Sequence, residues 1–472
     1  MRVLIVSHFF PPHVATASRR IHAIATAFGE AGHDVTVLTS RKRVKDMIAP
    51  LDGGNFRVIE VPFRLPRAVE KCRAWLKAGQ NQPTQAGASS LRENGTGQSG
   101  LGNDRTRRKY SPAGVINAIR RRTGVASAVR MPDLSRYWVR PAAEAARDLA
   151  ARDGEWDVIL SSAGPYTCHL IAMRLMNAGL GKRWIAEYRD LWSGNNLYSG
   201  LFPFTLVEHT LDRRVLRCAD ALVAISEPMS DWIRSRTDKN VHTIYNGYSA
   251  SELTREFTQT ANRPFRLVYT GVLNTSGRNI DAVLGGIAKA IDLGIDVRLE
   301  LAGENHGPFI EAVRHHKLSG SFHHHGLLPR DAAIQLQRNA DALLLVEWHD
   351  PRAGVLTSKL FDYIAAGPPI LVTGPEGELS NIVRSLDRGL QAGDSPESVA
   401  RAITSLANQE ITFDPSALAI SNFSRETQSA KLVRIAELLG SHHADRSCPK
   451  PASWAVRESA PPRANMQEMR NA

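Results

Sequence analysis

The sequence predicts an α/β protein with two doubly wound parallel sheets, one in each of two Rossmann-like domains that face a cleft. Three observations support this prediction. Short apolar runs alternate with amphipathic helical segments, which is the pattern of parallel strands joined by helical crossovers. The pattern stops at a polar stretch from Ala250 to Pro264 and then begins again. The length of 472 residues is also sufficient for two or three domains of ordinary size.

The first half is predicted to form an N-terminal domain over residues 1–250. Apolar runs bounded by polar residues are typical of buried strands, and longer amphipathic segments between them are typical of helices. The expected strands are Val3–Val6, Asp34–Leu38, Asp157–Leu160, Arg183–Glu187, Ala221–Ile225 and Val241–Ile244, and the expected helices are Ala17–Ala31, about His169–Ala178 and one ending near Cys218.

A basic insertion interrupts this domain over residues 78–135. Its first part, Ala78 to Asn103, is rich in Gly, Ser, Gln and Asn, which predicts a loop or partial disorder. Apolar residues beside the arginines of 105–140 suggest a helix on an anionic membrane surface, and a solvated insertion is the alternative. Aromatic side chains are nearly absent between the arginines, so no nucleic-acid partner is expected. The basic residues are Arg105, Arg107, Arg108, Lys109, Arg120, Arg121, Arg122, Arg130, Arg136 and Arg140.

The second half is predicted to form a C-terminal domain over residues 264–423, followed by a closing helix over 424–440 and a disordered tail over 441–472. The tail is rich in Pro, Arg, Ser and Ala, a composition that rarely supports a packed core. The expected strands are Phe265–Tyr269, Asp296–Ala302, Phe322–Gly326, Ala342–Val346 and Ile370–Val372, and the expected helices are Ile280–Leu293, Asp331–Gln337 and one beginning at Lys359.

Composition narrows the cellular context and the kind of partner. The net charge of +12 and the pI near 9.7 favour an anionic partner such as acidic lipid or a phosphorylated small molecule. The four cysteines include no C-x-x-C pair, and no apolar run approaches the ~20 residues that span a bilayer. No signal peptide precedes the first strand. We therefore expect a cytoplasmic protein that associates peripherally with the inner face of the plasma membrane.

The segment from Gly354 into the helix at Lys359 is a candidate anion site. Backbone N–H groups and hydroxyls at a helix start can converge on a phosphate, and the helix dipole favours negative charge there. Lys359 adds a formal positive charge. The alternative is an ordinary amphipathic turn that ends at the Gly367–Pro368 break.

Polar side chains also follow the strand predicted at Arg183–Glu187. Glu187, Arg189 and Asp190 are expected at the carboxyl end of this strand, which is where open α/β sheets bind ligands. The alternative is that Arg189 and Asp190 pair with each other or cap the next helix. His169 follows a Gly-Pro turn near a helix start, so it either reaches a ligand or packs in the core.

Several segments occur in the order found in one known family. They are Phe9–Pro12, Gly32–Val37, Ser161–Pro165, Trp184–Trp192, Ala219–Ser226, Asn246–Gly247, Ala302–Glu304 and Lys359–Pro369. In this order they resemble the retaining nucleotide-sugar glycosyltransferases of family 4, which have the GT-B fold, and Arg189–Trp192 resembles the "RDlW" segment of a bacterial subgroup. The likeness runs from Met1 to about Gly440, with a gap over the insertion.

The resemblance implies roles for individual residues. Arg278 and Lys359 would clamp the donor diphosphate as the glycosidic bond breaks, and His169 would be a third catalytic residue. The implied donor-binding residues are Gly271, Gly303, Glu304, Gly326, Leu327, Gly354, Val355, Leu356, Thr357, Ser358 and Asp362. The implied acceptor-side residues are Pro11, Pro12, Glu187, Arg189 and Asp190. No cofactor or metal is expected, because the sequence contains no Asp-x-Asp pair for a diphosphate-bound cation.

The sequence departs from the family pattern in the glutamate pair that usually contacts the donor. Gly354 stands at the first position of the pair and Asp362 at the second. Val272 replaces an arginine, and Ser161 and Ser162 replace a histidine. The expected function is transfer of a sugar from a nucleotide-diphosphate donor, with retention, to a glycan or lipid-linked acceptor of cell-envelope polysaccharide synthesis. The alternatives are a UDP-sugar epimerase of similar architecture and a non-catalytic GT-B binding module.

Overall fold

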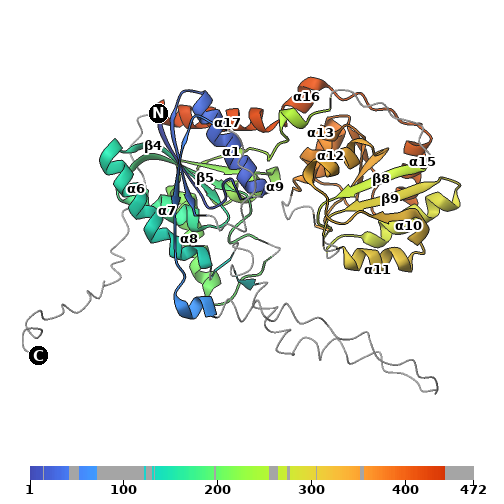
Figure 1. Cartoon of the computed structure of the whole chain (residues 1–472), viewed down its shortest axis with the longest axis horizontal. Coiled ribbons are helices and arrows are strands. Elements are labelled where there is room, and N and C mark those ends of the chain that lie inside the picture. Colours follow the sequence, from blue (N-terminus) through green and yellow to red (C-terminus); the bar gives the residue numbers. More distant parts are fainter. Residues whose placement is uncertain are drawn as a thin grey trace, which may run out of the picture.

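Two α/β domains lie side by side in the protein (Figure 1). The computed structural model describes residues 1–13, 15–41, 53–71, 122–123, 130–131, 133–195, 198–254, 264–273, 277–304, 306–350 and 356–441. Each domain holds one sheet whose paired strands are all parallel. The predicted fold class is confirmed.

The first domain contains a seven-stranded sheet in the order β3-β2-β1-β4-β5-β6-β7. After β3 the chain crosses back to add β4 on the other side of β1, so the order of strand addition reverses between β1 and β4. This position is the topological switch point of the sheet. Its strands are β1 (Arg2–Ser7), β2 (Asp34–Ser40), β3 (Arg57–Val61), β4 (Trp156–Ala163), β5 (Gly181–Tyr188), β6 (Ala221–Ala224) and β7 (Asn240–Thr243). Its helices are α1 (Thr16–Glu30), α6 (Val139–Asp153), α7 (Thr167–Asn177), α8 (Phe204–Cys218) and α9 (Glu227–Arg234), with a 3-10 helix, η2 (Leu134–Trp138).

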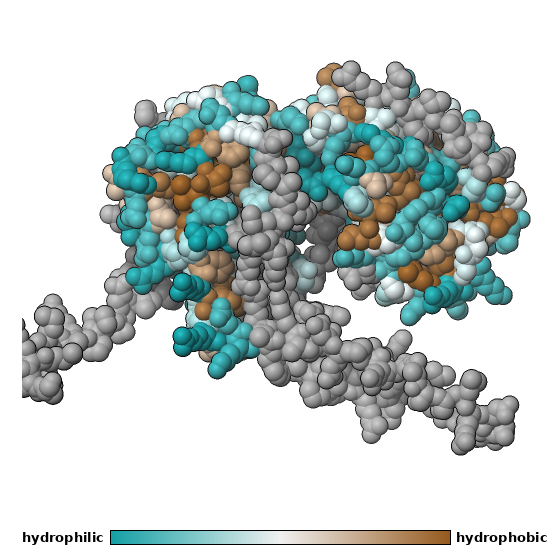
Figure 2. All heavy atoms as spheres, in the orientation of Figure 1, coloured by the Kyte–Doolittle hydropathy of each residue, from teal (hydrophilic) through white to brown (hydrophobic). Residues whose placement is uncertain are grey.

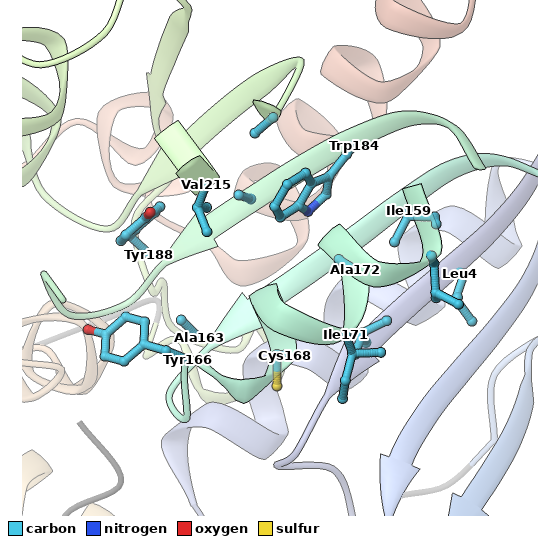
Figure 3. Close-up of a cluster of buried hydrophobic side chains, with 14 of the residues drawn as sticks. Leu4, Ile159, Ala163, Tyr166, Cys168, Ile171, Ala172, Trp184, Tyr188 and Val215 are labelled. Carbon is cyan, nitrogen blue, oxygen red and sulfur yellow. The ribbon is translucent and has the colours of Figure 1, made fainter. Parts of the chain in front are cut away.

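One face of this sheet packs against α6, α7 and α8. Figure 3 shows part of the resulting core, where Ile171 of α7 and Trp184 of β5 lie among buried aliphatic and aromatic side chains. Trp138, Trp156 and Trp184 are fully buried in the same core. Burial of such large side chains makes this face a major source of the stability of the domain.

The second domain contains a six-stranded sheet in the order β10-β9-β8-β11-β12-β13. The switch point here lies between β8 and β11, at the centre of the sheet. Its strands are β8 (Phe265–Thr270), β9 (Val297–Ala302), β10 (Phe322–His324), β11 (Ala342–Val346), β12 (Ile370–Thr373) and β13 (Gly389–Gln391). Its helices are α10 (Ile280–Asp292), α11 (Gly307–His315), α12 (Arg330–Arg338), α13 (Lys359–Ala366), α14 (Glu378–Ser385), α15 (Pro396–Ala407) and α16 (Ala417–Ser421), with two 3-10 helices, η3 (Ala250–Glu252) and η4 (Ser319–Ser321).

The last helix, α17 (Arg425–Ser441), returns to the first domain and lies along α1 (Figure 1). Leu432 and Val433 of α17 share a core with Ile21 and Phe28 of α1 and with the sheet beneath them. The segment predicted as a closing helix therefore covers the second face of the first sheet. It ties the end of the second domain to the domain where the chain begins.

The structure corrects one part of the predicted membrane surface. Arg130 is 5% exposed, and its guanidinium pairs with Glu208 at 3.1 Å and donates to the Trp192 carbonyl at 2.8 Å. A buried and paired arginine cannot face lipid, so Arg130 belongs to the core of the domain. Residues 105–121 lie outside the described residues, whereas Arg140 is exposed on α6. No helix in the described ranges is both long and apolar enough to cross a membrane.

Candidate functional site

The carboxyl ends of β8 and β9 approach each other closely at two glycines. Gly271 follows β8 with φ +92° and Gly303 follows β9 with φ +139°, values that side chains rarely allow. A Cβ atom on Gly303 would lie 2.7 Å from the Gly271 carbonyl oxygen. Glycine at Gly303 thus permits the two loops to pack backbone against backbone beside the switch point.

Lys359, the first residue of α13, reaches this pair of loops. A Cβ atom on Gly271 would lie 2.8 Å from Lys359 Cε, so the lysine stem crosses the space that glycine leaves free. Its ammonium lies 5.4 Å from the centroid of the Tyr269 ring. The helix start and the end of β8 therefore bring a cation to the centre of the sheet edge.

Arg278 approaches the same place from the segment before α10. Its Nε donates to the Val346 carbonyl at 2.8 Å, and its guanidinium carbon lies 4.0 Å from the centroid of the Trp348 ring. Burial, followed by the charge of Arg278, lowers the pKa of Lys359 to about 8. Burial also lowers the pKa of Arg278. Two partly buried cations that repel each other favour a ligand with several negative charges.

His306 forms a hydrogen bond to the loop that follows β8. Its Nε2 lies 2.9 Å from the Gly271 carbonyl oxygen and its Nδ1 lies 2.9 Å from His324 Nε2. Because a carbonyl oxygen only accepts, His306 carries its proton on Nε2 and its Nδ1 accepts from His324. Burial lowers the pKa of His306, the hydrogen bond to Gly271 raises it, and electrostatic interactions with His324 and Lys359 lower it further.

Asp362, predicted to bind the donor, lies one turn beyond Lys359 on α13. Its Oδ1 accepts from Arg330 at 3.2 Å, and Arg330 also makes a forked ion pair with Glu252. The side chain of Leu356 packs in the core beneath α13, so only its backbone is left for a ligand. Gly354 and Val355 lie outside the described residues.

The other predicted donor-side residues border the Lys359 site. Gly326 follows β10 with φ +69°, and its carbonyl accepts from Gly303 N–H at 2.7 Å. Glu304 and Leu327 are exposed on neighbouring loops. Thr357 and Ser358 precede α13, and Lys359 N–H donates to Thr357 Oγ1 at 3.4 Å. The structure thus places most of the predicted donor-side residues along one edge of the second sheet.

Glu187, predicted on the acceptor side, is instead fully buried. It pairs with Arg20 of α1 at 2.8 Å and accepts from Ser162 Oγ. Arg20 also donates to the carbonyls of Ile244 and Tyr245. The carboxylate therefore fastens α1 to the end of the sheet and is closed to an acceptor.

His169 is likewise a core residue, which corrects the prediction that it contacts the substrate. Its ring is 0% exposed and packs against Tyr188 with ring centroids 4.9 Å apart. Its Nδ1 shares a hydrogen bond of 2.8 Å with Ser161 Oγ, which also accepts from Trp184 Nε1. Burial lowers the pKa of His169 to about 3, so the ring is neutral and sealed from the cleft.

Arg189 and Asp190 do reach the edge of the first sheet, where both are half-buried. Arg189 donates to the carbonyls of Ala163 and Gly164 at 2.7 and 2.9 Å, and its guanidinium lies 5.7 Å from the Phe9 ring centroid. Burial raises the pKa of Asp190, and Arg189 lowers it. Pro11 and Pro12 follow β1 at the same edge and are half-buried. Arg189 thus connects the loops that follow β4 and β5.

Several residues near the predicted site had no motif to mark them. Glu347 and Trp348 directly follow β11, and Glu378 begins α14. Glu378 Oε1 accepts from Glu227 N–H at 2.7 Å and from Tyr245 OH at 3.1 Å, so it joins the second domain to the first. The sequence could have indicated Glu347 through its position immediately after an apolar strand, where open α/β sheets bind ligands.

The space-filling view shows the surface hollowed between the two domains (Figure 2).

A groove with a volume of about 1250 Å³ runs along α1 and α17. Arg19, Arg330 and Arg425 line one end of it, together with Glu252. Lys359 and Arg278 are not among its lining residues. The groove nevertheless adjoins α13, because Arg330 in its lining pairs with Asp362, one turn beyond Lys359.

Comparison with known proteins identifies the kind of enzyme. Residues 103–252 match the family model described as Glycosyltransferase Family 4. Together with the GT-B fold, this match supports a glycosyltransferase that is similar to family 4. No curated protein matches the sequence of this glycosyltransferase.

The solved structures similar to the glycosyltransferase extend over almost its whole length. Sucrose-phosphate synthase from Thermosynechococcus elongatus matches with a TM-score of 0.58 at 12% identity, covering 93% of this chain and 98% of its own. HepE from Anabaena in complex with UDP matches with a TM-score of 0.55 at 12% identity, covering 93% and 100%. The lipopolysaccharide outer core galactosyltransferase WaaB matches with a TM-score of 0.54 at 11% identity, covering 93% and 99%. At these identities the comparison establishes the fold.

Proposed function

We propose that this glycosyltransferase moves a sugar from a nucleotide-diphosphate donor to a glycan or lipid-linked acceptor, with retention of anomeric configuration and without a metal ion. The observation that carries the proposal is the pair of cations formed by Lys359 and Arg278 at the switch point of the second sheet. HepE, a structural neighbour, has been solved with UDP and with UDP-glucose. A diphosphate is the ligand whose charge best matches this pair.

In the proposed reaction the bond between the sugar anomeric carbon and the diphosphate oxygen breaks. A hydroxyl oxygen of the acceptor forms the new bond to that carbon, and its proton passes to the departing diphosphate. Negative charge grows on the diphosphate as the bond breaks. Lys359 and Arg278 would stabilise this charge in the transition state, which is electrostatic catalysis by positioned donors. The acceptor would enter along the edge bearing Pro11, Pro12, Arg189 and Asp190.

A thermal-shift panel tests the donor site. UDP, GDP, ADP and their common sugar conjugates are added to the wild type and to Lys359→Ala. A ligand at ~100 times its dissociation constant adds ~2.7 kcal/mol to the free energy of unfolding. We expect stabilisation by one nucleotide series, and its loss in Lys359→Ala. No stabilisation by any series would favour the non-catalytic alternative.

Product analysis then separates transfer from epimerisation. Transfer requires an acceptor and releases nucleoside diphosphate, whereas an epimerase converts the free nucleotide sugar with no acceptor present. We expect activity to persist in EDTA. Loss of turnover in EDTA that a divalent metal restores would contradict the metal-independent mechanism.

The neighbour WaaB acts in the lipopolysaccharide outer core, which supports a cell-envelope acceptor for this chain. We propose that the arginine-rich residues 105–121 hold the enzyme at an anionic membrane surface. Deletion of residues 78–121 keeps the buried Arg130 and tests this proposal. Weaker partitioning onto anionic liposomes is the expected result, and unchanged partitioning would contradict it.

A further inference from the structure

Glu347 is a nearly buried acidic residue beside the donor site. It follows β11 directly, between β8 and β12 in the sheet, and its N–H donates to the Thr373 carbonyl at 2.8 Å. Only 6% of the residue is exposed. Burial raises the pKa of its carboxyl, while the Arg278 charge lowers it. A carboxylate at this depth costs free energy unless it has a partner.

The two carboxylate oxygens of Glu347 have different surroundings. Oε1 accepts from Trp348 N–H at 2.9 Å, and the Trp348 ring packs against the Arg278 guanidinium. Oε2 accepts no hydrogen bond from the described residues, and it is not sealed from solvent. The hydrogen bond from Trp348 N–H therefore holds one carboxylate oxygen of Glu347 and leaves the other available to a ligand that donates.

A second carboxyl group, that of Glu378 at the start of α14, lies close enough to Glu347 for their charges to interact. The pKa of Glu378 rises to about 7, mainly because it is buried and in smaller part because of the charges of Glu227 and Glu347. Glu378 is held by Glu227 N–H and Tyr245 OH of the first domain. A negatively charged group near these two carboxyls would be repelled when they are ionised, whereas a hydroxyl can donate to them.

We propose that Glu347 accepts hydrogen bonds from hydroxyl groups of the transferred sugar and restricts the donor to neutral sugars over uronic acids. This inference rests on the proposed function. The sugar is bonded to the diphosphate, so a diphosphate held by Lys359 and Arg278 places the sugar next to the clamp. Glu347 adjoins Arg278 through Trp348 and is fixed before the ligand arrives, which reduces the ordering cost of recognition.

Calorimetry with UDP, UDP-glucose, UDP-galactose and UDP-glucuronate tests the inference, with the corresponding GDP series used if GDP binds better. The wild type should bind its preferred neutral conjugate at least tenfold more tightly than the glucuronate conjugate. Glu347→Gln should not weaken UDP binding, because it removes a negative charge near the diphosphate clamp, and it should weaken the neutral conjugate about tenfold, as expected for loss of a charge-assisted hydrogen bond. The same variant should improve binding of the glucuronate conjugate.

Glu376→Gln is the matched control, because Glu376 is an exposed carboxylate that pairs with Arg384 on the same side of the domain. It should leave every affinity unchanged. Equal wild-type affinity for neutral and glucuronate conjugates would overturn the inference, and that result does not depend on whether a variant folds. Unchanged affinity for the neutral conjugate in a folded Glu347→Gln would overturn it as well. Failure of the wild type to bind any nucleoside diphosphate would instead remove the donor site itself.

Discussion

The carboxyl ends of the two sheets differ in whether a buried cation lies beside a carboxylate or beside a second cation. In the first domain, Arg20 and Glu187 form a buried ion pair, and Arg189 donates to the carbonyls of neighbouring loops. In the second domain, the cations of Lys359 and Arg278 lie close enough that one lowers the pKa of the other. The ion pair of the first domain holds α1 against the end of the sheet, whereas the two neighbouring cations of the second domain repel each other and favour an anionic ligand.

Breaking the ion pair of the first domain should have the largest effect. Arg20→Met leaves Glu187 buried without its partner, and we expect the free energy of unfolding to fall by about 3–5 kcal/mol. Urea denaturation measures this change. Arg384→Met is the control, because Arg384 pairs with Glu376 on the exposed surface and should cost less than about 1 kcal/mol. Similar losses in the two variants would show that the buried pair contributes no more to the free energy of unfolding than an exposed pair does.

Removing a cation of the second domain should instead increase the free energy of unfolding. Lys359→Met keeps the apolar stem and removes a charge that burial and Arg278 disfavour, so the free protein should gain about 1 kcal/mol of stability. Donor affinity should fall about 100-fold, because the diphosphate loses one of its two cations. Chemical denaturation and calorimetry measure the two effects. A variant that is less stable and still binds the donor would contradict the comparison.

The pH dependence of donor binding sharpens the same contrast. Lys359 is charged below its pKa of about 8 and loses its proton as the pH rises through that value. Donor affinity should therefore fall about tenfold between pH 7 and pH 9, since one pKa unit corresponds to a factor of ten. A nucleotide sugar is the suitable probe. The Lys359→Met variant should show a flat profile, and an equal fall in that variant would assign the effect to another group.

The smallest effect is expected where the two domains meet, at Glu378. Its pKa of about 7 in the folded state exceeds the ordinary value of 4.5, so the unfolded state loses its proton first as the pH rises. Stability should fall between about pH 4.5 and pH 7 and remain lower above that range. Glu378→Gln should reduce this loss by about 1 kcal/mol, allowing for partial exposure. Urea denaturation at pH 5 and pH 8 checks it, and identical curves for variant and wild type would exclude Glu378 as the cause.

Much of the fold followed from local patterns. The apolar runs at Val3–Val6 and Ala342–Val346 are strands, and the segment after Lys359 is a helix. Elements without a strong local signal were not predicted. The strand β13 has only three residues, and α6 buries a face composed mostly of alanine within an arginine-rich segment. Short strands and small apolar faces are stabilised by tertiary packing, which periodicity does not report.

The candidate site was predictable only in part, for a related reason. The positions of Lys359 and Glu187 at a helix start and a strand end could be derived from sequence, because the carboxyl ends of parallel strands share one edge. Arg278 was assigned only from the resemblance to family 4. Whether such a charge has a partner could not. His169 follows a Gly-Pro turn in a segment typical of a ligand contact, and it is sealed in the core by Trp184 and Tyr188.

The sequence by itself determined the α/β fold with its two parallel sheets. Tertiary structure alone decided which charges are paired. Arg20 and Glu187 are 167 positions apart in the chain, and Glu378 finds Tyr245 across 133 positions. Electrostatic and hydrogen-bond partners are set by distance in space, which local sequence does not contain. Tertiary packing buries Glu187 against Arg20 in the first domain, and it places Lys359 near Arg278 in the second.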